Sequence, residues 1–315
     1  MTLSKLLRHE TILALLTVAA LIALAMLSDK FFTTSNLLNQ GRLMSEIGLV
    51  ALAMTFVIVT GGIDLSVGSI LGLTAILLGV FWKNVGMPLP LAMVAAVACG
   101  TAAGIGNGFI ITRFRVPPLI ATLSTLALYR GLAEGISEAR SVRGYPEWFY
   151  FFGQGEIAGV PVQLWILVIC TVIAGVILGF TPFGRATYAV GANEVAARFS
   201  GINADATKVW IYGAAGFLSA IAAVIFVSRV TTTRSDMGTG IELDVITGVV
   251  LGGTSIFGGK GTIVGTVLGL VLIQALKNGL ALSGVKGDGT IVVIGVVLIA
   301  AVLAGAILDR NRGGS

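Results

Sequence analysis

The polar side chains that could do chemistry in this chain are few, and they lie within or beside long apolar runs. Asp64 stands in the glycine-rich stretch Val59-Thr60-Gly61-Gly62-Ile63-Asp64-Leu65-Ser66-Val67-Gly68-Ser69, between two such runs. A charge near the bilayer interior costs at least ~2.5–3.5 kcal/mol unless it faces protein or water. Glycine backbone is tolerated there only where protein or a water-filled cavity satisfies it. The stretch therefore predicts a broken spanning helix that lines a path, or a turn between spans with Asp64 wetted at the interface.

The other polar groups near the apolar runs are mostly neutral. Asn107, Gln274 and Asn278 each carry both donors and acceptors, which suits transient passage of an uncharged polyhydroxylated solute better than an ion that needs full coordination. Hydrogen bonding between helices is the alternative role for these amides. The residues that we expect to border a translocation path are Asp64, Ser66, Asn107, Thr122, Thr254, Gln274 and Asn278.

The sequence does not support catalysis by this chain. Residues 251–261 resemble a phosphate-binding loop, but Thr254 stands where its first glycine belongs, and Gly261 follows Lys260 where Ser or Thr is needed. The single histidine excludes a His-based triad and a zinc cluster. Paired carboxylates are missing from the apolar runs. We expect no catalytic residue, no metal site and no cofactor.

The elements that must position these groups are membrane spans. Of the 315 residues, 56% are hydrophobic and only 11% are charged, whereas soluble domains contain about 25% charged residues. At roughly 20 residues a span, the chain has room for about ten spans and little else. We expect one all-α transmembrane domain over residues 1–315, with broken helices. The apolar runs lie at 11–27, 43–60, 67–82, 88–111, 117–136, 163–181, 208–228, 243–257, 261–282 and 290–308.

An even number of spans places both termini on one side of the membrane. If that side is the cytoplasm, the inner loops hold ten Lys and Arg residues and the outer loops hold eight. The positive-inside rule therefore favours cytoplasmic termini. We found no block of like charges that would indicate nucleic-acid binding.

Two loops are long enough to have structure of their own. Outer loop 137–162 is crowded with aromatic residues, which favours a helix in the membrane interface, a docking surface for an extracytoplasmic partner, or both. Within inner loop 182–207, residues 193–199 form a short amphipathic helix candidate, with Asn193 as its cap and Gly201 as its stop. This patterning favours a surface for a cytoplasmic partner.

Glycines recur at four-residue spacing in two places, at Gly100, Gly104 and Gly108 and at Gly261, Gly265 and Gly269. Such stripes predict close packing between helices of this chain, or else a homodimer seam. Residues 61–66 and 252–255 also resemble each other weakly, each before an apolar run. Transporters are often built from repeats, but the expected topology does not match a simple inversion.

Three ordered motifs, at residues 61–69, 183–202 and 238–262, resemble the permease subunits of ribose-type ABC sugar importers. The resemblance covers nearly the whole chain. It implies a bacterial inner-membrane pore of two permeases, copies or paralogues, with ATPase subunits at the cytoplasmic face and a periplasmic sugar-binding protein outside. It also implies that inner loop 182–207 couples to the ATPase. The coupling residues carried over are Gly184, Arg185, Gly191, Asn193, Glu194, Ala197, Arg198 and Gly201.

Residues 127–131 and 228–238 are similar to members that serve rhamnose or autoinducer-2. The resemblance thus implies a multi-pass permease for a monosaccharide or a similar solute, with ATP hydrolysed by separate subunits. The alternative is an ion-coupled secondary transporter that acts without an ATPase, because broken helices fit that class equally well.

Overall fold

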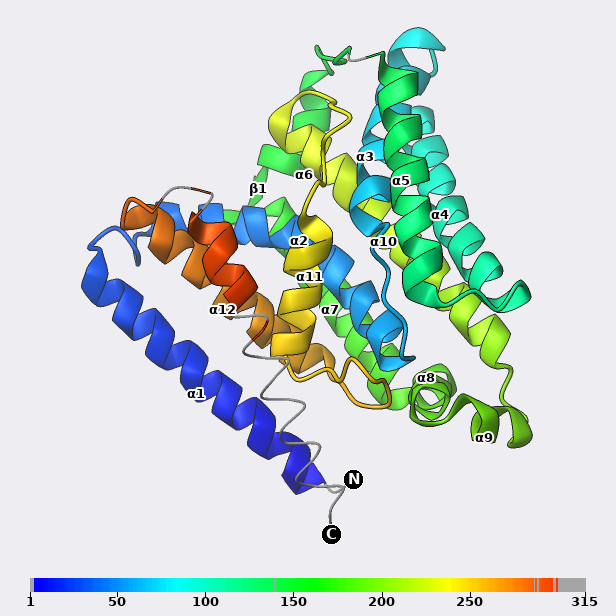
Figure 1. Cartoon of the computed structure of the whole chain (residues 1–315). Helices are drawn as coiled ribbons and strands as arrows, with labels where there is room; N and C mark the ends of the chain where they lie inside the picture. The colour runs from blue at the N-terminus through cyan, green and yellow to red at the C-terminus, as the bar shows by residue number, and fades with distance from the viewer. Residues whose placement is uncertain (1–2, 139, 286, 288, 297–298, 300–315) are drawn as a thin grey trace.

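A computed structural model describes residues 3–138, 140–285, 287, 289–296 and 299 (Figure 1). The described chain is mostly helical, as expected. Six helical segments are long and apolar enough to cross a membrane. They are α2 (Thr34–Val59), α3 (Val67–Gly79) with the π-helical turn η1 (Val80–Asn84), α4 (Leu89–Arg113), α7 (Val162–Phe180), α10 (Ala204–Val230) and α12 (Ile263–Leu282).

The remaining elements are shorter or more polar. α5 (Pro118–Ser137) has the length of a span but carries Arg130, Glu134 and several hydroxyl side chains. α1 (Leu3–Leu27) is a long helix at the start of the chain. The others are η2 (Glu147–Tyr150), α6 (Phe151–Gln154), α8 (Pro182–Ala192), α9 (Glu194–Phe199), α11 (Ile241–Leu251) and the antiparallel pair β1 (Glu156–Ile157) and β2 (Val160–Pro161).

The expected apolar runs correspond to helices, but several boundaries were wrong. α2 begins nine residues before the expected run at 43–60, because Thr33 caps it and its first turns are polar. α10 likewise begins at a cap, Asn203. The eighth run was expected at 243–257, but α11 ends at Leu251, since the chain turns at Gly252 and Gly253 takes a positive φ of 88°. The run at 290–308 lies largely outside the described residues.

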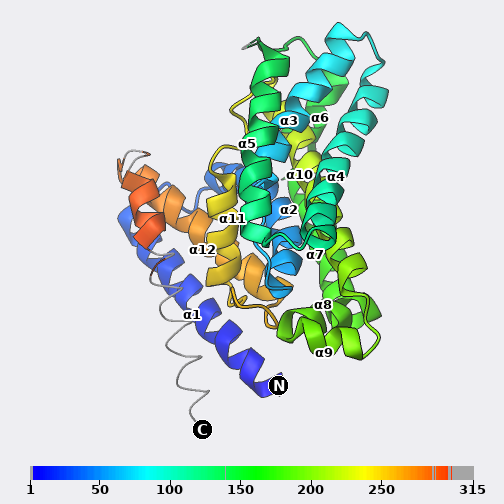
Figure 2. The same cartoon turned by 45° about the vertical axis from the view of Figure 1, so that its right-hand side comes forward.

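The helices are arranged between two ends of the molecule (Figures 1 and 2). One end carries α8 and α9 and is here called the α8–α9 end. The other carries α6 with its flanking loop and is here called the α6 end. α2, α10 and the continuous segment of α3 and η1 form the centre, where most side chains are buried. α4 and α7 instead expose long apolar faces. Those exposed faces suit contact with lipid.

The aromatic loop 137–162 packs on the protein more closely than an interfacial helix would. Phe149 is fully buried, and its carbonyl accepts a hydrogen bond from Ser228 Oγ at 2.6 Å. Tyr145 stacks on Trp82 with ring centroids 4.4 Å apart. Trp148 and Phe151 remain about half exposed. The loop therefore covers the end of α10 and presents only part of its aromatic surface outward.

The glycine stripes are used for packing within the chain. A Cβ at Gly100 would lie 2.7 Å from Ala220 Cβ on α10, and one at Gly104 would overlap the Tyr212 carbonyl oxygen. On the second stripe, a Cβ at Gly265 or Gly269 would overlap the backbone carbonyls of Gly252 or Gly248. α4 thus lies directly on α10, and α12 directly on α11, as the small-residue rule for membrane helices leads one to expect.

Gly104→Ala tests this packing. The new methyl group would be forced onto the Tyr212 backbone, so we expect a loss of about 1–3 kcal/mol, as for overpacked cores. The matched control is Gly106→Ala on the same helix, whose Cβ would lie 3.9 Å from Tyr129 Oη, an ordinary contact. The measurement is the folded, monodisperse fraction after heating in detergent. Equal heat resistance of the two variants would contradict close α4–α10 contact.

Candidate functional site

α8 and α9 form a compact unit in the segment expected to be an inner loop. Thr181 caps α8 by accepting a hydrogen bond from Gly184 N at 3.2 Å, with Pro182 in the first turn. Asn193 ends α8 and caps α9, accepting from Ala196 N at 3.0 Å. Gly201 takes a φ of 81° just after α9. The helix expected at residues 193–199 is confirmed with its cap and its stop, whereas α8 was missed despite its Thr-Pro start.

A network of ion pairs holds α9 against the start of α10. Arg198 pairs with Glu194 at 2.8 Å and with Asp205, and Lys208 pairs with Glu194 at 2.5 Å. Although partial burial raises the pKa of Glu194, hydrogen bonds from Lys208 and Arg198 outweigh it and leave this pKa below its usual range. Hydrogen bonds to Asp205 and Glu194 raise the pKa of Arg198. The network fixes the direction in which α9 presents its other side chains.

Those other side chains are apolar and face outward. Ala197 is buried against Val190 and Ala204. On the opposite side of α9, Phe199 is 89% exposed and Val195 is 64% exposed. An aromatic side chain held outward by an ordered helix is typical of a contact surface for another protein.

The end of α8 meets both breaks in the membrane helices at one point, here called the glycine junction and formed by Val59, Gly61, Gly191, Gly258 and Gly259. Gly259 N donates to Val59 O at 2.8 Å. A Cβ on Gly191 would overlap the same carbonyl oxygen. A Cβ on Gly258 would lie 2.9 Å from Gly61 N. Only glycines permit three backbone segments to approach this closely.

A side chain supports the same junction from α8. Tyr188 Oη donates to the carbonyl of Gly261 at 2.7 Å, in the segment that joins α11 to α12. The breaks after α2 and after α11, which resemble each other in sequence, are thus neighbours in space. Displacement of α8 would therefore act on both breaks together.

Asp64 lies in a buried cluster beside the break. Its Oδ1 accepts from Ser66 N at 2.9 Å and from Ser66 Oγ at 2.6 Å, and Asn107 Nδ2 donates to Ser66 Oγ at 2.7 Å. Tyr129 Oη donates to Asn107 Oδ1 at 3.2 Å. Thr122 Oγ1 donates to the Ile63 carbonyl at 3.0 Å. Asp64 is fully buried, so the alternative of a carboxylate wetted at the interface is wrong.

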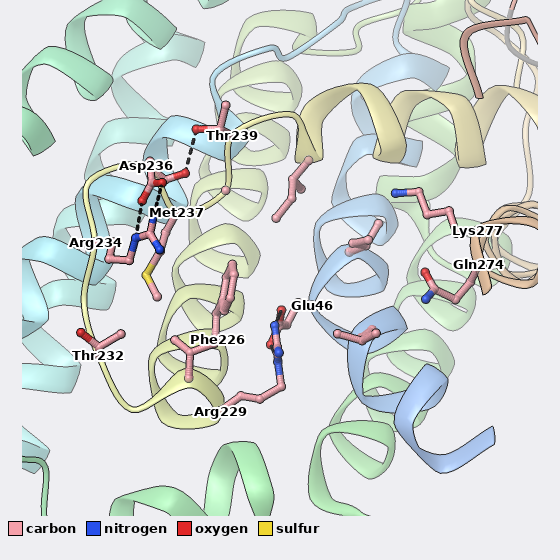
Figure 3. A pocket seen from close by; sticks show the side chains of 15 residues that line it. Glu46, Phe226, Arg229, Thr232, Arg234, Asp236, Met237, Thr239, Gln274 and Lys277 are labelled. Carbon is pink, nitrogen blue, oxygen red and sulfur yellow. Dashed lines mark hydrogen bonds and ion pairs between the residues drawn. The ribbon is translucent and has the colours of Figure 1, made fainter. Parts of the chain in front are cut away.

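A cavity of about 580 Å³ lies near the α6 end between α2, α10, α12 and the 231–240 segment (Figure 3). In its wall, Arg229 Nε and Nη2 donate to the two carboxylate oxygens of Glu46 at 2.7 and 3.0 Å. Arg234 pairs with Asp236 at 2.5 Å at the rim. Lys277 pairs with Asp244 at 2.5 Å. This is the candidate for the outer part of a path and is here called the outer cavity.

An amide chain continues from the outer cavity between α2 and α12. Gln274, which lines the cavity, donates through Nε2 to Gln40 Oε1 at 2.6 Å. Gln40 Nε2 in turn donates to Asn278 Oδ1 at 2.9 Å. The two amides expected on the path are therefore linked through Gln40, which the sequence reasoning missed.

The structure places the expected path residues in three locations. Asp64, Ser66, Asn107 and Thr122 form the buried cluster; Thr254 is buried in the turn after α11; Gln274 and Asn278 belong to the amide chain. Sequence reasoning did not find the Glu46–Arg229 pair. Its signal was a carboxylate within one apolar run and a cation at the end of another, because such charges in membrane helices require partners.

The fold and these sites are those of a membrane-spanning subunit of a transporter: a multi-pass helical bundle with broken helices, a cavity at one end and an exposed apolar helix face at the other. The chain belongs to the family described as the permease component of a branched-chain amino acid transport system, which it matches over residues 34–302.

The chain is also similar to curated proteins with narrower descriptions. It is 43% identical over 265 residues to the ribose import permease protein RbsC of Bacillus subtilis, covering 84% of this chain and 82% of that protein. It is 41% identical over 285 residues to RbsC of Escherichia coli K12, covering 89% and 87%. The autoinducer 2 import system permease protein LsrD of Escherichia coli is 37% identical over 281 residues, covering 87% and 85%.

Gly191→Ala tests the glycine junction. Because the added methyl group cannot share space with the Val59 carbonyl, we expect α8 to be pushed away from the end of α2 and the α8–α9 unit to open locally. Trypsin should then cut after Arg185 and Arg198 about tenfold faster than in the wild type, as a local loss of about 1.4 kcal/mol implies. The control is Gly179→Ala, whose Cβ would have no neighbour within 4 Å. Equal cleavage of both variants would show that the junction is not tight.

Asp64→Ala tests the buried cluster. The substitution leaves Ser66 N and Ser66 Oγ without their acceptor in a buried place, so we expect the unfolding free energy to fall by about 1–3 kcal/mol. The exposed Asp29→Ala at the α1–α2 turn serves as control. Thermal unfolding in nanodiscs is the measurement, and unchanged Tm in Asp64→Ala would mean that the cluster contributes nothing to holding the break.

Proposed function

We propose that this chain is the permease subunit of an ATP-binding cassette importer that carries a monosaccharide or a similar small polyhydroxylated solute across a bacterial inner membrane. The observation that carries the proposal is the α8–α9 unit, an ordered partner surface joined through the glycine junction to two helix breaks. The ribose and autoinducer 2 import permeases among its relatives support the solute class. The family description supports the permease role.

The proposed topology has about ten spans, as the length and hydropathy of the sequence suggest. α1, α5 and α11, together with the last apolar run, would join the six long apolar segments. α1 begins at the α8–α9 end (Figure 1). With that end in the cytoplasm, both termini are cytoplasmic, and the 138–161 loop and the 231–240 segment face the outside.

The proposed path enters through the outer cavity, passes the amides of Asn278 and Gln274, and leaves near Thr254. We assign Asp64, Ser66, Asn107 and Thr122 to the wall of this path, where they fix the shape of the break. Below the outer cavity α2 and α12 are joined by the hydroxyls of Thr55 and Thr266, 2.7 Å apart. The helices must separate there for the solute to pass, and a change between two packings accomplishes this.

Separate subunits supply the energy in this scheme. ATP binding closes two ATPase subunits, which move the segment from Gly184 to Gly201, and the glycine junction passes the movement to α2 and to the α11–α12 turn. The remaining residues of the coupling set are Arg185, Gly191, Asn193, Glu194, Ala197 and Arg198. A second permease, copy or paralogue, completes the pore. A periplasmic sugar-binding protein docks at the α6 end.

Phe199→Ala tests the coupling surface. Phe199 is the aromatic side chain of α9 and is 89% exposed. Its truncation should therefore weaken capture of the ATPase subunit by about tenfold or more, as expected for a hot-spot residue. The control is Phe32→Ala, an exposed phenylalanine in the α1–α2 turn, toward the α6 end. Co-purification and solute-stimulated ATP hydrolysis in proteoliposomes are the measurements.

Two results would refute the proposal. The first is capture of the ATPase subunit by Phe199→Ala at the wild-type level, because α8–α9 would then not be the contact surface. The second is accumulation of solute by the chain reconstituted alone, with an ion gradient and without nucleotide.

A further inference from the structure

We propose that the outer cavity is a binding site for one neutral monosaccharide, held by the Glu46–Arg229 pair and by Gln274. The inference rests on the proposed function and deepens it, because it assigns the contacts that the solute makes inside the permease after it leaves the binding protein. It is carried by the geometry of the cavity wall rather than by the sequence motifs.

The charges that face the outer cavity compensate one another. Glu46 is paired with Arg229, Arg234 with Asp236, and Lys277 with Asp244. An anion or a cation entering such a wall would have to compete with these ion pairs, of which Glu46–Arg229 is the most buried, with the Glu46 side chain 4% exposed. A neutral solute meets no such cost. The cavity therefore selects for uncharged ligands although it is lined with charged side chains.

The central pair keeps hydrogen-bonding capacity in reserve. Arg229 uses Nε and Nη2 on Glu46, which leaves its remaining N–H groups and the outer lone pairs of the carboxylate free for neighbouring hydroxyls. Vicinal hydroxyls of a sugar are both donors and acceptors, so they can bridge such a pair without breaking it. Gln274 contributes a second donor–acceptor group from α12 on the facing wall (Figure 3).

An apolar surface lies next to these polar groups. The Arg229 guanidinium lies over the Phe226 ring, 4.8 Å from its centroid. The other apolar side chains of the cavity come from α2, from the end of α10, from the segment before α11 and from the first residue of α11. They are Leu43, Ile47, Val230, Met237 and Ile241. A monosaccharide ring has just this division, with hydroxyls at its edge and C–H groups on its faces.

The volume of the cavity and its small number of spare hydrogen-bonding groups also fit a site that the solute occupies only transiently. About 580 Å³ lies within the ~300–1,000 Å³ range of small-molecule pockets, with room for one sugar and water. The sugar uses only the spare donors and acceptors of the wall, and each such hydrogen bond replaces one to water, so its net contribution is small. Weak binding is what a passage site needs, since the solute must leave it in each cycle.

The test uses the complete importer, with its ATPase and binding protein, in proteoliposomes and D-ribose as the radiolabelled probe. Leu43→Trp fills the cavity from α2 without removing a polar group, and Gln274→Leu removes one hydrogen-bonding wall group. We expect both to lower the D-ribose uptake rate by about tenfold, as the loss of one or two hydrogen bonds or of the binding volume implies. Both variants should still co-purify with the ATPase and a second permease in wild-type amount, because the coupling surface is untouched.

Leu37→Trp is the matched control, since Leu37 is exposed on the same helix and does not line the cavity. Normal uptake by Leu43→Trp and Gln274→Leu, in an importer whose wild type transports D-ribose, would overturn the inference while leaving the proposed function intact. Loss of assembly in Leu43→Trp with normal uptake in Gln274→Leu would also overturn it. Absence of any ATP-driven uptake by the wild type would instead overturn the proposed function.

Discussion

The structure depends on one backbone contact, the hydrogen bond from Gly259 N to Val59 O with Gly191 pressed against the same carbonyl. The end of a helix leaves carbonyls without partners, and in a membrane protein each must be satisfied by protein or by water in a cavity. Here the carbonyl of one break is satisfied by the loop of the other. The α8–α9 unit is therefore in direct backbone contact with both broken helices.

This arrangement separates two requirements that a transporter has to meet. Rigidity is concentrated at the α8–α9 end, where ion pairs, helix caps and the buried Asp64 cluster hold the helices in place. The α6 end instead holds the outer cavity, and part of its aromatic loop is exposed. Between them, smooth glycine surfaces on α4, α10, α11 and α12 allow helices to slide with small changes in contact.

Most of the fold could be predicted from the sequence, because hydropathy identifies apolar helices whatever their partners. The cap at Asn193 and the stop at Gly201 were also predictable, since capping is local chemistry. The meeting of Asp64 with Asn107 and Tyr129, or of Gln40 with Gln274, was not, because these pairs are set by how distant helices pack. Likewise, nothing in the spacing of Gly191 indicates that it faces Val59. The early start of α2 was missed because its first turns are polar.

The outward-facing Phe199 has a consequence for how the subunit is made. In the proposed complex the ATPase subunit covers Phe199, so a chain synthesised in excess of that subunit would carry a bare aromatic group on a helix outside the long apolar segments. Exposed apolar groups of this kind favour self-association and removal by quality-control proteases. On the proposed function, the abundance of the permease would thus be tied to the supply of the ATPase subunit that shields this ring.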